Sequence, residues 1–318
     1  MKSDIVLLSL TANPKLAQEV ADILGIQLGK TEVTHFADGE VLARSPDNVR
    51  GKVVYIIQST ASPVAERIME LLIFIDGIRN AKAKEINLVI PYYGFCRQDR
   101  VARPGEPITA RLIADLLNTV GVNRVITMDL HTPQTQGFFG CPVDDLSPIP
   151  LLGEHFRASF ERSGISTRDV VVVSPDHGSI HRARDMASEL PNSSIAIIDK
   201  RRPAPNVAEV MHVIGDVKDK HALIVDDIID TGGTIITCTE AILALGARSV
   251  RVAGTHAVLS AGAVERLKKC NLAEIAITNS IEHPDPYWEV ISIAPMIAGV
   301  IRASEEGAPL PEAWMNFY

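Results

Sequence analysis

The segment from Val225 to Thr234 constrains the fold of this chain more than any other part of it. It reads VDDIIDTGGT and directly follows the apolar residues Ala222, Leu223 and Ile224. A short apolar run of this kind predicts a buried strand. Two adjacent carboxylates at the carboxyl end of such a strand can accept hydrogen bonds from a pair of vicinal sugar hydroxyls. The chain is therefore expected to build a buried sheet whose edge carries two acids.

The residues after the paired acids predict a turn that binds an anion. Two threonines there offer hydroxyls, and two glycines leave backbone N–H groups open where the next helix is expected to begin. The amino end of a helix carries partial positive charge, which favours a phosphate. The alternative is a strand with a solvated acidic tip and a Gly-rich turn. This segment is predicted to bind the hydroxyls of a ribose and the phosphate attached to it. The residues concerned are Asp226, Asp227, Asp230, Thr231, Gly232, Gly233 and Thr234.

Apolar segments alternate with helical patterns along the rest of the chain. One helix is expected from Pro14 to Leu24, with Asn13 as its N-cap and Gly25 at its end. Such alternation predicts an α/β fold with parallel sheets covered by helices on both faces and with ligands at the carboxyl ends of the strands. A second helix is expected to bury the stripe Leu112, Ile113, Leu116, Leu117 and Val120. Strands are expected at 5–10, 53–57, 86–91, 125–128, 170–174, 194–198, 221–225, 250–255 and 274–278.

The length of the chain predicts two domains. At 318 residues it exceeds the size of a typical single domain. The segment Ser147–Pro150, which reads SPIP, breaks regular structure, so we place the boundary there. The expected domains are 1–147 and 148–318, and the final helix can pack back on the first domain.

Composition excludes several classes of protein. The formal net charge of −8 argues against a nucleic-acid binder, which needs a basic surface. Glu70 and Asp76 interrupt the longest apolar stretch, so no membrane span is expected. The amino-terminal residues show no signal-peptide pattern. The 4 cysteines are widely spaced and have no CxxC motif, which predicts reduced thiols and a cytoplasmic protein.

Two further motifs contain side chains suited to phosphate chemistry. In Ser174–Gly178, which reads SPDHG, Asp176 directly follows an expected strand and can bind Mg²⁺ or a sugar hydroxyl. Arg97 and Gln98, in the motif RQDR, can donate to a nucleotide phosphate or to adenine, because the guanidinium fork fits a phosphate. Each motif also has a plainer interpretation, as a turn aspartate or as a solvated charged loop.

The order and spacing of several motifs resemble one known family. The motifs are THFADGE at 34–40, RQDR at 97–100, MDLHTPQTQGFF at 128–139, SPDHG at 174–178, DKRRP at 199–203 and the acidic turn described first. The acidic turn resembles the phosphoribosyl-diphosphate-binding loop of the phosphoribosyltransferase superfamily. Together the motifs resemble the ribose-phosphate pyrophosphokinase family within it, over almost the whole chain.

The resemblance implies a fold, a reaction and a cofactor. The fold would be two phosphoribosyltransferase-like domains, each a mainly parallel sheet flanked by helices, with ATP on the first and ribose 5-phosphate on the second. The reaction would transfer the diphosphate group of ATP to the anomeric hydroxyl of ribose 5-phosphate, giving 5-phosphoribosyl 1-diphosphate and AMP. Mg²⁺ would be held by His131 and Asp176. The implied ATP-binding residues are Phe36, Asp38, Glu40, Arg97, Gln98, Asp99 and His131.

The resemblance also assigns functions to two loops whose composition alone indicates none. Lys200 and Arg202 would belong to a catalytic loop that closes over the transferring group, although a basic run is more often a solvated face. The segment from Phe36 to Glu40 would hold adenine in the site of a neighbouring subunit, whereas alone it reads as an exposed turn. Shared sites imply a homo-oligomer, which in this family is a homohexamer built of dimers.

Some positions depart from the family pattern, and two rival functions remain. Regulated members have a serine and an arginine where we align Asn48 and Gly105, so the sequence does not predict phosphate activation or ADP allostery. One rival is a phosphoribosyltransferase of another class, which would share the acidic turn but would need a nucleobase. The other is a non-catalytic regulatory homologue, which should have lost residues such as Asp176 or Lys200.

Overall fold

The computed structural model describes residues 5–201, 210–283 and 287–316, and the chain divides into two compact units. Unit 1 comprises Met1–Ser147, Asn279–His283 and Ser292–Tyr318. Unit 2 comprises Pro148–Thr278 and Pro284–Ile291. Each unit is an α/β layer structure with its own sheet, so the predicted fold class is confirmed.

Unit 1 is built on a parallel sheet with the strand order β1-β4-β5-β6-β7. The strands are β1 (Ile5–Ser9), β4 (Val53–Ile57), β5 (Glu85–Ile90), β6 (Arg124–Met128) and β7 (Val143–Leu146). The helices are α1 (Pro14–Leu24), α2 (Val64–Asn80), α3 (Thr109–Val120) and α8 (Ala294–Glu306), with short 3₁₀ turns η1 (Pro133–Phe138) and η3 (Glu312–Trp314). An antiparallel hairpin, β2 (Glu32–His35) and β3 (Val41–Arg44), packs on α2.

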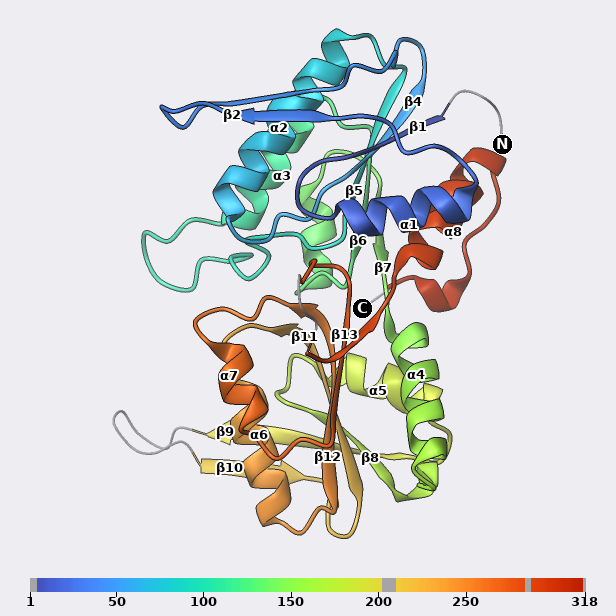
Figure 1. Ribbon diagram of the computed structural model, residues 1–318. Helices are drawn as coiled ribbons and strands as arrows, with labels where there is room; N and C mark the ends of the chain where they lie inside the picture. Colours follow the sequence, from blue (N-terminus) through green and yellow to red (C-terminus); the bar gives the residue numbers. More distant parts are fainter. Residues whose placement is uncertain (1–4, 202–209, 284–286, 317–318) are drawn as a thin grey trace. The chain divides into compact units, whose positions relative to one another are not determined.

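The helices of unit 1 form two pairs. Helices α1 and α8 pack side by side, and α2 packs against α3 (Figure 1). Helix α1 starts at Pro14 and ends at Gly25, whose left-handed φ of 69° closes the last turn, so this predicted helix is confirmed. The side chain of Asn13 does not cap it and donates instead to the backbone oxygens of Asn279 and Ser280.

The apolar stripe predicted for the second helix is wrong in part. Ile113 and Leu117 are buried, but Leu112 and Leu116 are 53% and 38% exposed. The buried face of α3 is completed by Ala110 and Ala114. Small side chains allow the helix to approach its neighbours closely, and the bulkier Leu112 and Leu116, two positions from these alanines, then lie on the outer side.

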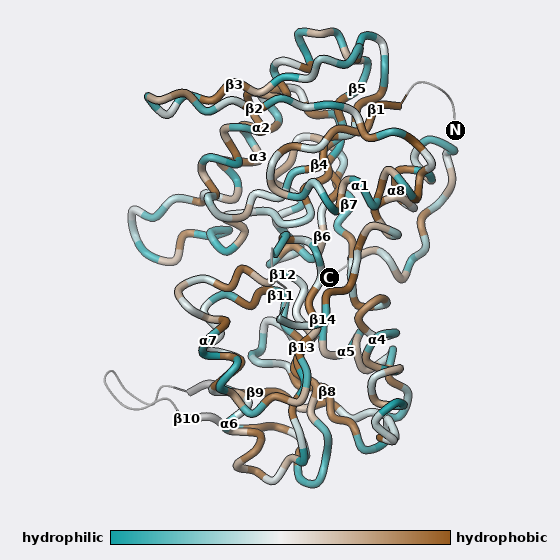
Figure 2. Tube along the Cα trace, in the orientation of Figure 1, coloured by the Kyte–Doolittle hydropathy of each residue, from teal (hydrophilic) through white to brown (hydrophobic). Residues whose placement is uncertain are grey.

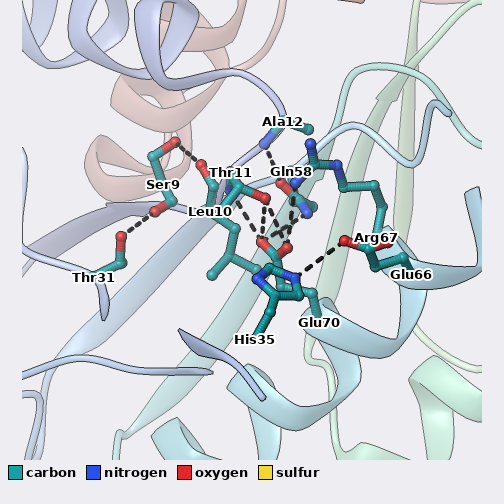
Figure 3. Close-up of polar contacts among 10 residues, drawn as sticks. All are labelled: Ser9, Leu10, Thr11, Ala12, Thr31, His35, Gln58, Glu66, Arg67 and Glu70. Carbon is teal, nitrogen blue, oxygen red and sulfur yellow. Dashed lines mark hydrogen bonds and ion pairs between the residues drawn. The ribbon is translucent and has the colours of Figure 1, made fainter. Parts of the chain in front are cut away.

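A buried carboxylate ties α2 to the carboxyl ends of two adjacent strands. The Glu70 side chain is fully buried (0% exposed). It accepts hydrogen bonds from the backbone N–H of Thr11 at 3.0 Å and from its hydroxyl, from Gln58 Nε2 at 3.2 Å, and from Arg67 Nη1 at 3.3 Å (Figure 3). Thr11 follows β1 and Gln58 follows β4. Buried charge is tolerated here because donors surround it.

Unit 2 is built on a larger sheet with the strand order β10-β9-β8-β11-β12-β13-β14. The pairs are parallel except β9 with β10, which is antiparallel. The strands are β8 (Val170–Ser174), β9 (Ser194–Arg201), β10 (Val210–Ile214), β11 (His221–Ile229), β12 (Ser249–Ala257), β13 (Glu274–Thr278) and β14 (Glu289–Ile291). The helices are α4 (Ile149–Arg162), α5 (Ile180–Glu189), α6 (Gly233–Ala244) and α7 (Ala263–Lys268), with the 3₁₀ turn η2 (Thr167–Asp169).

Both faces of the unit 2 sheet are covered. Val171 and Val173 pack in one apolar cluster with residues of α6, while Val170 and Val172 pack in another with residues of α4 and α5. Apolar residues accordingly gather along the strands (Figure 2). Burial on both faces explains why these strands read as continuous apolar runs rather than as alternating patterns. Every helix in the described part of the chain is too short or too polar to span a bilayer.

Candidate functional site

Strand β11 carries the paired acids, and it is longer than the sequence predicted. The expected strand ended at Val225, but β11 continues to Ile229. Its pairing with β8 stops at Ile224, whereas its pairing with β12 runs on to the pair Ile229 and Ala257. Asp226 and the residue after it therefore lie within a strand, but beyond the end of the neighbouring β8, where one side of β11 no longer has a partner in the ladder.

The two acids have different electrostatic surroundings. Asp227 is buried, and its Oδ2 lies 3.7 Å from Nη2 of Arg182 on α5, in a pair whose side chains are each 5% exposed. Burial raises the pKa of the Asp226 carboxyl well above its ordinary value, and the carboxylates of Asp227 and Asp176 raise it further, while Arg182 lowers it. The sequence prediction missed Arg182, because an arginine within a helical pattern reads as solvated.

The turn after β11 leads directly into the start of a helix. Gly232 adopts a left-handed φ of 78°, and a Cβ there would lie 3.0 Å from the side chain of Leu267. Helix α6 begins at Gly233, and the side of the turn formed by Thr231, Gly233 and Thr234 is exposed. Exposed N–H groups at the start of a helix attract anions.

Two side chains support this turn from the segment after β12. Arg266 Nη2 donates to the backbone oxygen of Thr231 at 2.6 Å, and Arg266 Nη1 donates to that of Ala261 at 2.7 Å. The Ser260 hydroxyl donates to Asp230 Oδ1. This hydrogen bond fixes the side chain of Asp230 at the start of the turn. Sequence reasoning identified neither Ser260 nor Arg266, since nothing in their local pattern differs from an ordinary loop.

Asp176 lies where the sequence placed it, just after β8. Its side chain is exposed, and Oδ1 accepts a hydrogen bond from the backbone N–H of Ser179 at 2.9 Å. Because β8 is the neighbour of β11, the carboxylate is close enough to Asp226 to raise the pKa of that group. Nearby, His177 Nδ1 lies 3.8 Å from Asp199 Oδ1 on β9.

The structure brings the RQDR and DLH motifs together in unit 1. They follow β5 and β6, which are neighbours in the sheet. The hydroxyl of Thr132 donates to Asp99 Oδ2 at 2.8 Å, so Asp99 lies beside the residue that follows His131. The Gln98 side chain accepts from the hydroxyl of Thr109 at 2.5 Å. Arg97 and Gln98 are exposed, and His131 is partly exposed.

Phe36, Asp38 and Glu40 lie on the turn between β2 and β3. The turn is closed by hydrogen bonds from Phe36 N to Glu40 O at 2.8 Å and from Glu40 N to Asp38 Oδ1 at 3.1 Å. The Phe36 side chain is 48% exposed. Where β2 enters the turn, His35 Nε2 lies 3.1 Å from Glu66 Oε1 on α2 (Figure 3). A large apolar ring is thus presented to solvent on an anchored hairpin.

The predicted catalytic residues lie mostly outside the described part of the chain. Lys200 belongs to β9, where its backbone pairs with Met211, but its side chain is not among those described. Arg202 lies outside the described residues altogether.

The residues present fit a Mg²⁺ ion that is bound mainly by substrate. No group of three or more His, Cys, Asp or Glu side chains gathers as a cation site within residues 5–201, 210–283 and 287–316. Mg²⁺ usually takes one or two carboxylates together with substrate phosphates and water rather than a full protein cage. The exposed carboxylate of Asp176 is a donor of the required kind.

Comparison with known families matches both units. A model described as the N-terminal domain of ribose phosphate pyrophosphokinase matches residues 5–121. A model of the phosphoribosyl transferase domain matches residues 151–290.

Individual relatives match over nearly their whole length. A ribose-phosphate pyrophosphokinase of Bacillus subtilis (strain 168) is 50% identical over 308 residues, which is 95% of each chain. One from Corynebacterium ammoniagenes is 50% identical over 312 residues, 96% of each chain. A crystal structure of phosphoribosylpyrophosphate synthetase from Mycobacterium smegmatis superposes with a TM-score of 0.89 at 38% identity, covering 96% of this chain and 100% of that one. This chain therefore belongs to the ribose-phosphate pyrophosphokinase family.

Proposed function

We propose that this protein transfers the diphosphate group of ATP to the anomeric hydroxyl of ribose 5-phosphate. The hydroxyl oxygen forms a bond to the β-phosphorus, the bond between that phosphorus and the oxygen bridging to the α-phosphate breaks, and AMP leaves with that oxygen. The hydroxyl proton passes to solvent, and no side chain is assigned as an obligatory base. The observation that carries the proposal is the edge of β11, where two acids precede a left-handed turn at the start of α6.

Ribose 5-phosphate is assigned to this edge of unit 2. Asp226 and Asp227 accept hydrogen bonds from the two ribose hydroxyls, and the turn from Asp230 to Thr234 holds the 5-phosphate. The support is the exposed helix start and the fixed backbone, with Arg266 holding the turn from behind. A turn that is ordered before the ligand arrives loses less entropy on binding.

ATP is assigned to unit 1. Arg97 and Gln98 donate to the nucleotide, and His131 contacts its phosphates. The support is that neighbouring strands bring these motifs side by side and that Asp99 joins them through Thr132. Phosphoryl-type transfer depends chiefly on positioning and on neutralising charge, which suits exposed donors on fixed strand ends.

Mg²⁺ is the proposed cofactor, with Asp176 and His131 as its protein ligands. When bound, the ion would neutralise part of the negative charge on the transferring diphosphate. The Asp176 carboxylate supplies a hard oxygen donor, and its backbone N–H partner Ser179 fixes its orientation. A chain of net charge −8 needs local positive charge to bind polyphosphates, and a bound cation supplies it.

The proposed assembly is a homo-oligomer in the cytoplasm, with sites shared between subunits. We propose a homohexamer built of dimers, in which Phe36, Asp38 and Glu40 hold the adenine bound by a neighbouring copy. The exposed aromatic ring on a closed hairpin supports this assignment, because an apolar ring gains most when a partner covers it.

The reaction is tested by product analysis. ATP, ribose 5-phosphate and Mg²⁺ without any nucleobase are expected to give AMP and phosphoribosyl diphosphate in equal amounts. Formation of product only when a nucleobase is added would instead identify a phosphoribosyltransferase. Formation of neither product, in a folded protein, would identify a regulatory homologue.

Replacement of Lys200 tests the assigned catalytic loop. If this lysine stabilises charge that develops only in the transition state, Lys200→Ala should lower turnover on the order of 10³-fold while KM for both substrates changes little. Steady-state kinetics measure both constants. A raised KM with unchanged turnover would show that Lys200 binds the ground state instead.

The two glycines of the turn give a matched pair of variants. A Cβ at Gly233 would meet only Thr231 Oγ1, at 3.6 Å, so Gly233→Ala should fold normally. Its methyl group would still hinder close approach of the phosphate, and KM for ribose 5-phosphate should rise on the order of 10-fold, the loss of about one charge-assisted hydrogen bond. Gly232→Ala should instead destabilise the protein, by about 1–2 kcal/mol for the left-handed backbone alone. An unchanged KM in Gly233→Ala would mean that the phosphate binds elsewhere.

The raised pKa of Asp226 predicts how stability depends on pH. A carboxyl whose pKa is raised by folding stabilises the protein below its unfolded value of about 3.9, and this contribution is lost as the pH rises through the folded pKa. Asp226→Asn is neutral at every pH, so the ligand-free variant should resist urea better than the wild type at pH 8 and nearly equally at pH 4. Urea midpoints at both pH values measure this difference. A variant that is less stable at pH 8 would contradict the prediction.

A further inference from the structure

The loop that carries His131 is held on both sides by aspartates. Asp129, where the chain leaves β6, is buried and has a left-handed φ of 46°, which non-glycine residues rarely adopt. Its N–H donates to Leu146 O at 2.8 Å. The next N–H, that of Leu130, donates to Asp145 Oδ1 at 3.1 Å. On the other side of His131, Thr132 donates to Asp99.

Asp145 is in turn held by the segment that follows α8. The Asp145 side chain is fully buried on β7, and Asn316 is 8% exposed. Asn316 Nδ2 donates to Asp145 Oδ2 at 3.2 Å, and the backbone N–H of Asn316 donates to Asp145 O at 2.9 Å. Each carboxylate oxygen thus has its own donor, one from the His131 loop and one from Asn316.

The segment is fixed before it reaches Asp145. Ser147 N donates to Trp314 O at 2.9 Å, and Met315 forms an isolated antiparallel bridge with Leu146. The indole of Trp314 packs directly on α8, where a Cβ at Gly299 would lie 2.5 Å from the ring. Asn316 therefore presents its amide from an anchored backbone, and α8, β7 and the loop after β6 are joined in one series of contacts.

We propose that Asp145 and Asn316 are positioning residues for His131. Their buried contact fixes the left-handed turn from which His131 projects, so that the imidazole meets the ATP phosphates in one orientation. This inference rests on the proposed function, because it takes His131 to contact ATP. A carboxylate with donors fixed on both sides resists rotation, and a backbone strained at Asp129 needs such restraint to persist. Neither residue touches the substrate.

The test is a double-mutant cycle on ATP affinity. Dissociation constants for ATP with Mg²⁺, in the absence of ribose 5-phosphate, are measured for the wild type, Asn316→Ala, His131→Ala and the double variant. We expect each single change to weaken ATP binding, Asn316→Ala by about 10-fold, the loss of one hydrogen bond to a buried charge. The double variant should bind ATP no more weakly than His131→Ala, because Asn316 acts only through that residue.

A matched control and a second ligand separate positioning from general stability. Glu312→Ala alters an exposed residue of the same segment and should bind ATP as the wild type does. Ribose 5-phosphate affinity should be unchanged in all variants. Losses that multiply in the double variant, an equal weakening of both ligands, or wild-type ATP affinity in Asn316→Ala or in His131→Ala would each overturn the inference. If the wild-type protein forms no AMP, the proposed function fails, and the inference fails with it.

Discussion

The parallel ladder between β11 and β12 is the constraint on which the site of unit 2 depends. It continues to Ile229 and Ala257 after β8 has ended at its pairing with Ile224. Pairing with β12 holds this stretch of β11, including Asp226, extended beyond the end of β8. If β11 ended where β8 ends, both acids would lie on a loop, where their spacing would fluctuate. The same ladder fixes the point at which the turn into α6 begins.

The site is assembled at some cost to the stability of the unit. Two adjacent carboxylates lie where water solvates them poorly. The ion pair with Arg182 is made by Asp227, and burial raises the pKa of Asp226, so that its charged form is disfavoured in the absence of ligand. Glu70 in unit 1 shows the opposite arrangement, because donors from Thr11, Gln58 and Arg67 surround its buried carboxylate. Buried acids that hold the fold together, such as Glu70, are satisfied from within the protein, whereas Asp226 lies beside two further carboxylates.

The sequence predicted the long buried strands and the acidic turn, because an apolar run and a pair of glycines are local signals. It missed β7 and β14, which are short, as well as β10, and the hairpin β2 and β3, whose residues are largely exposed. It could not find Arg182 or Arg266, since their importance arises only when a helix or loop packs beside β11. The exposed leucines of α3 were misplaced because alanines form its buried face. The roles of individual residues toward ATP remain predictions.

Both units follow one succession of elements. In each, a first strand and helix are followed by an antiparallel hairpin, then by the remaining strands and helices of the sheet. The hairpins are β2 with β3 and β9 with β10. Because the two strands of a hairpin pair with each other, its connecting loop can lengthen or change without shifting the register of the strands behind it. The tip of the unit 1 hairpin, which carries the exposed Phe36, can therefore change without disturbing the sheet of that unit.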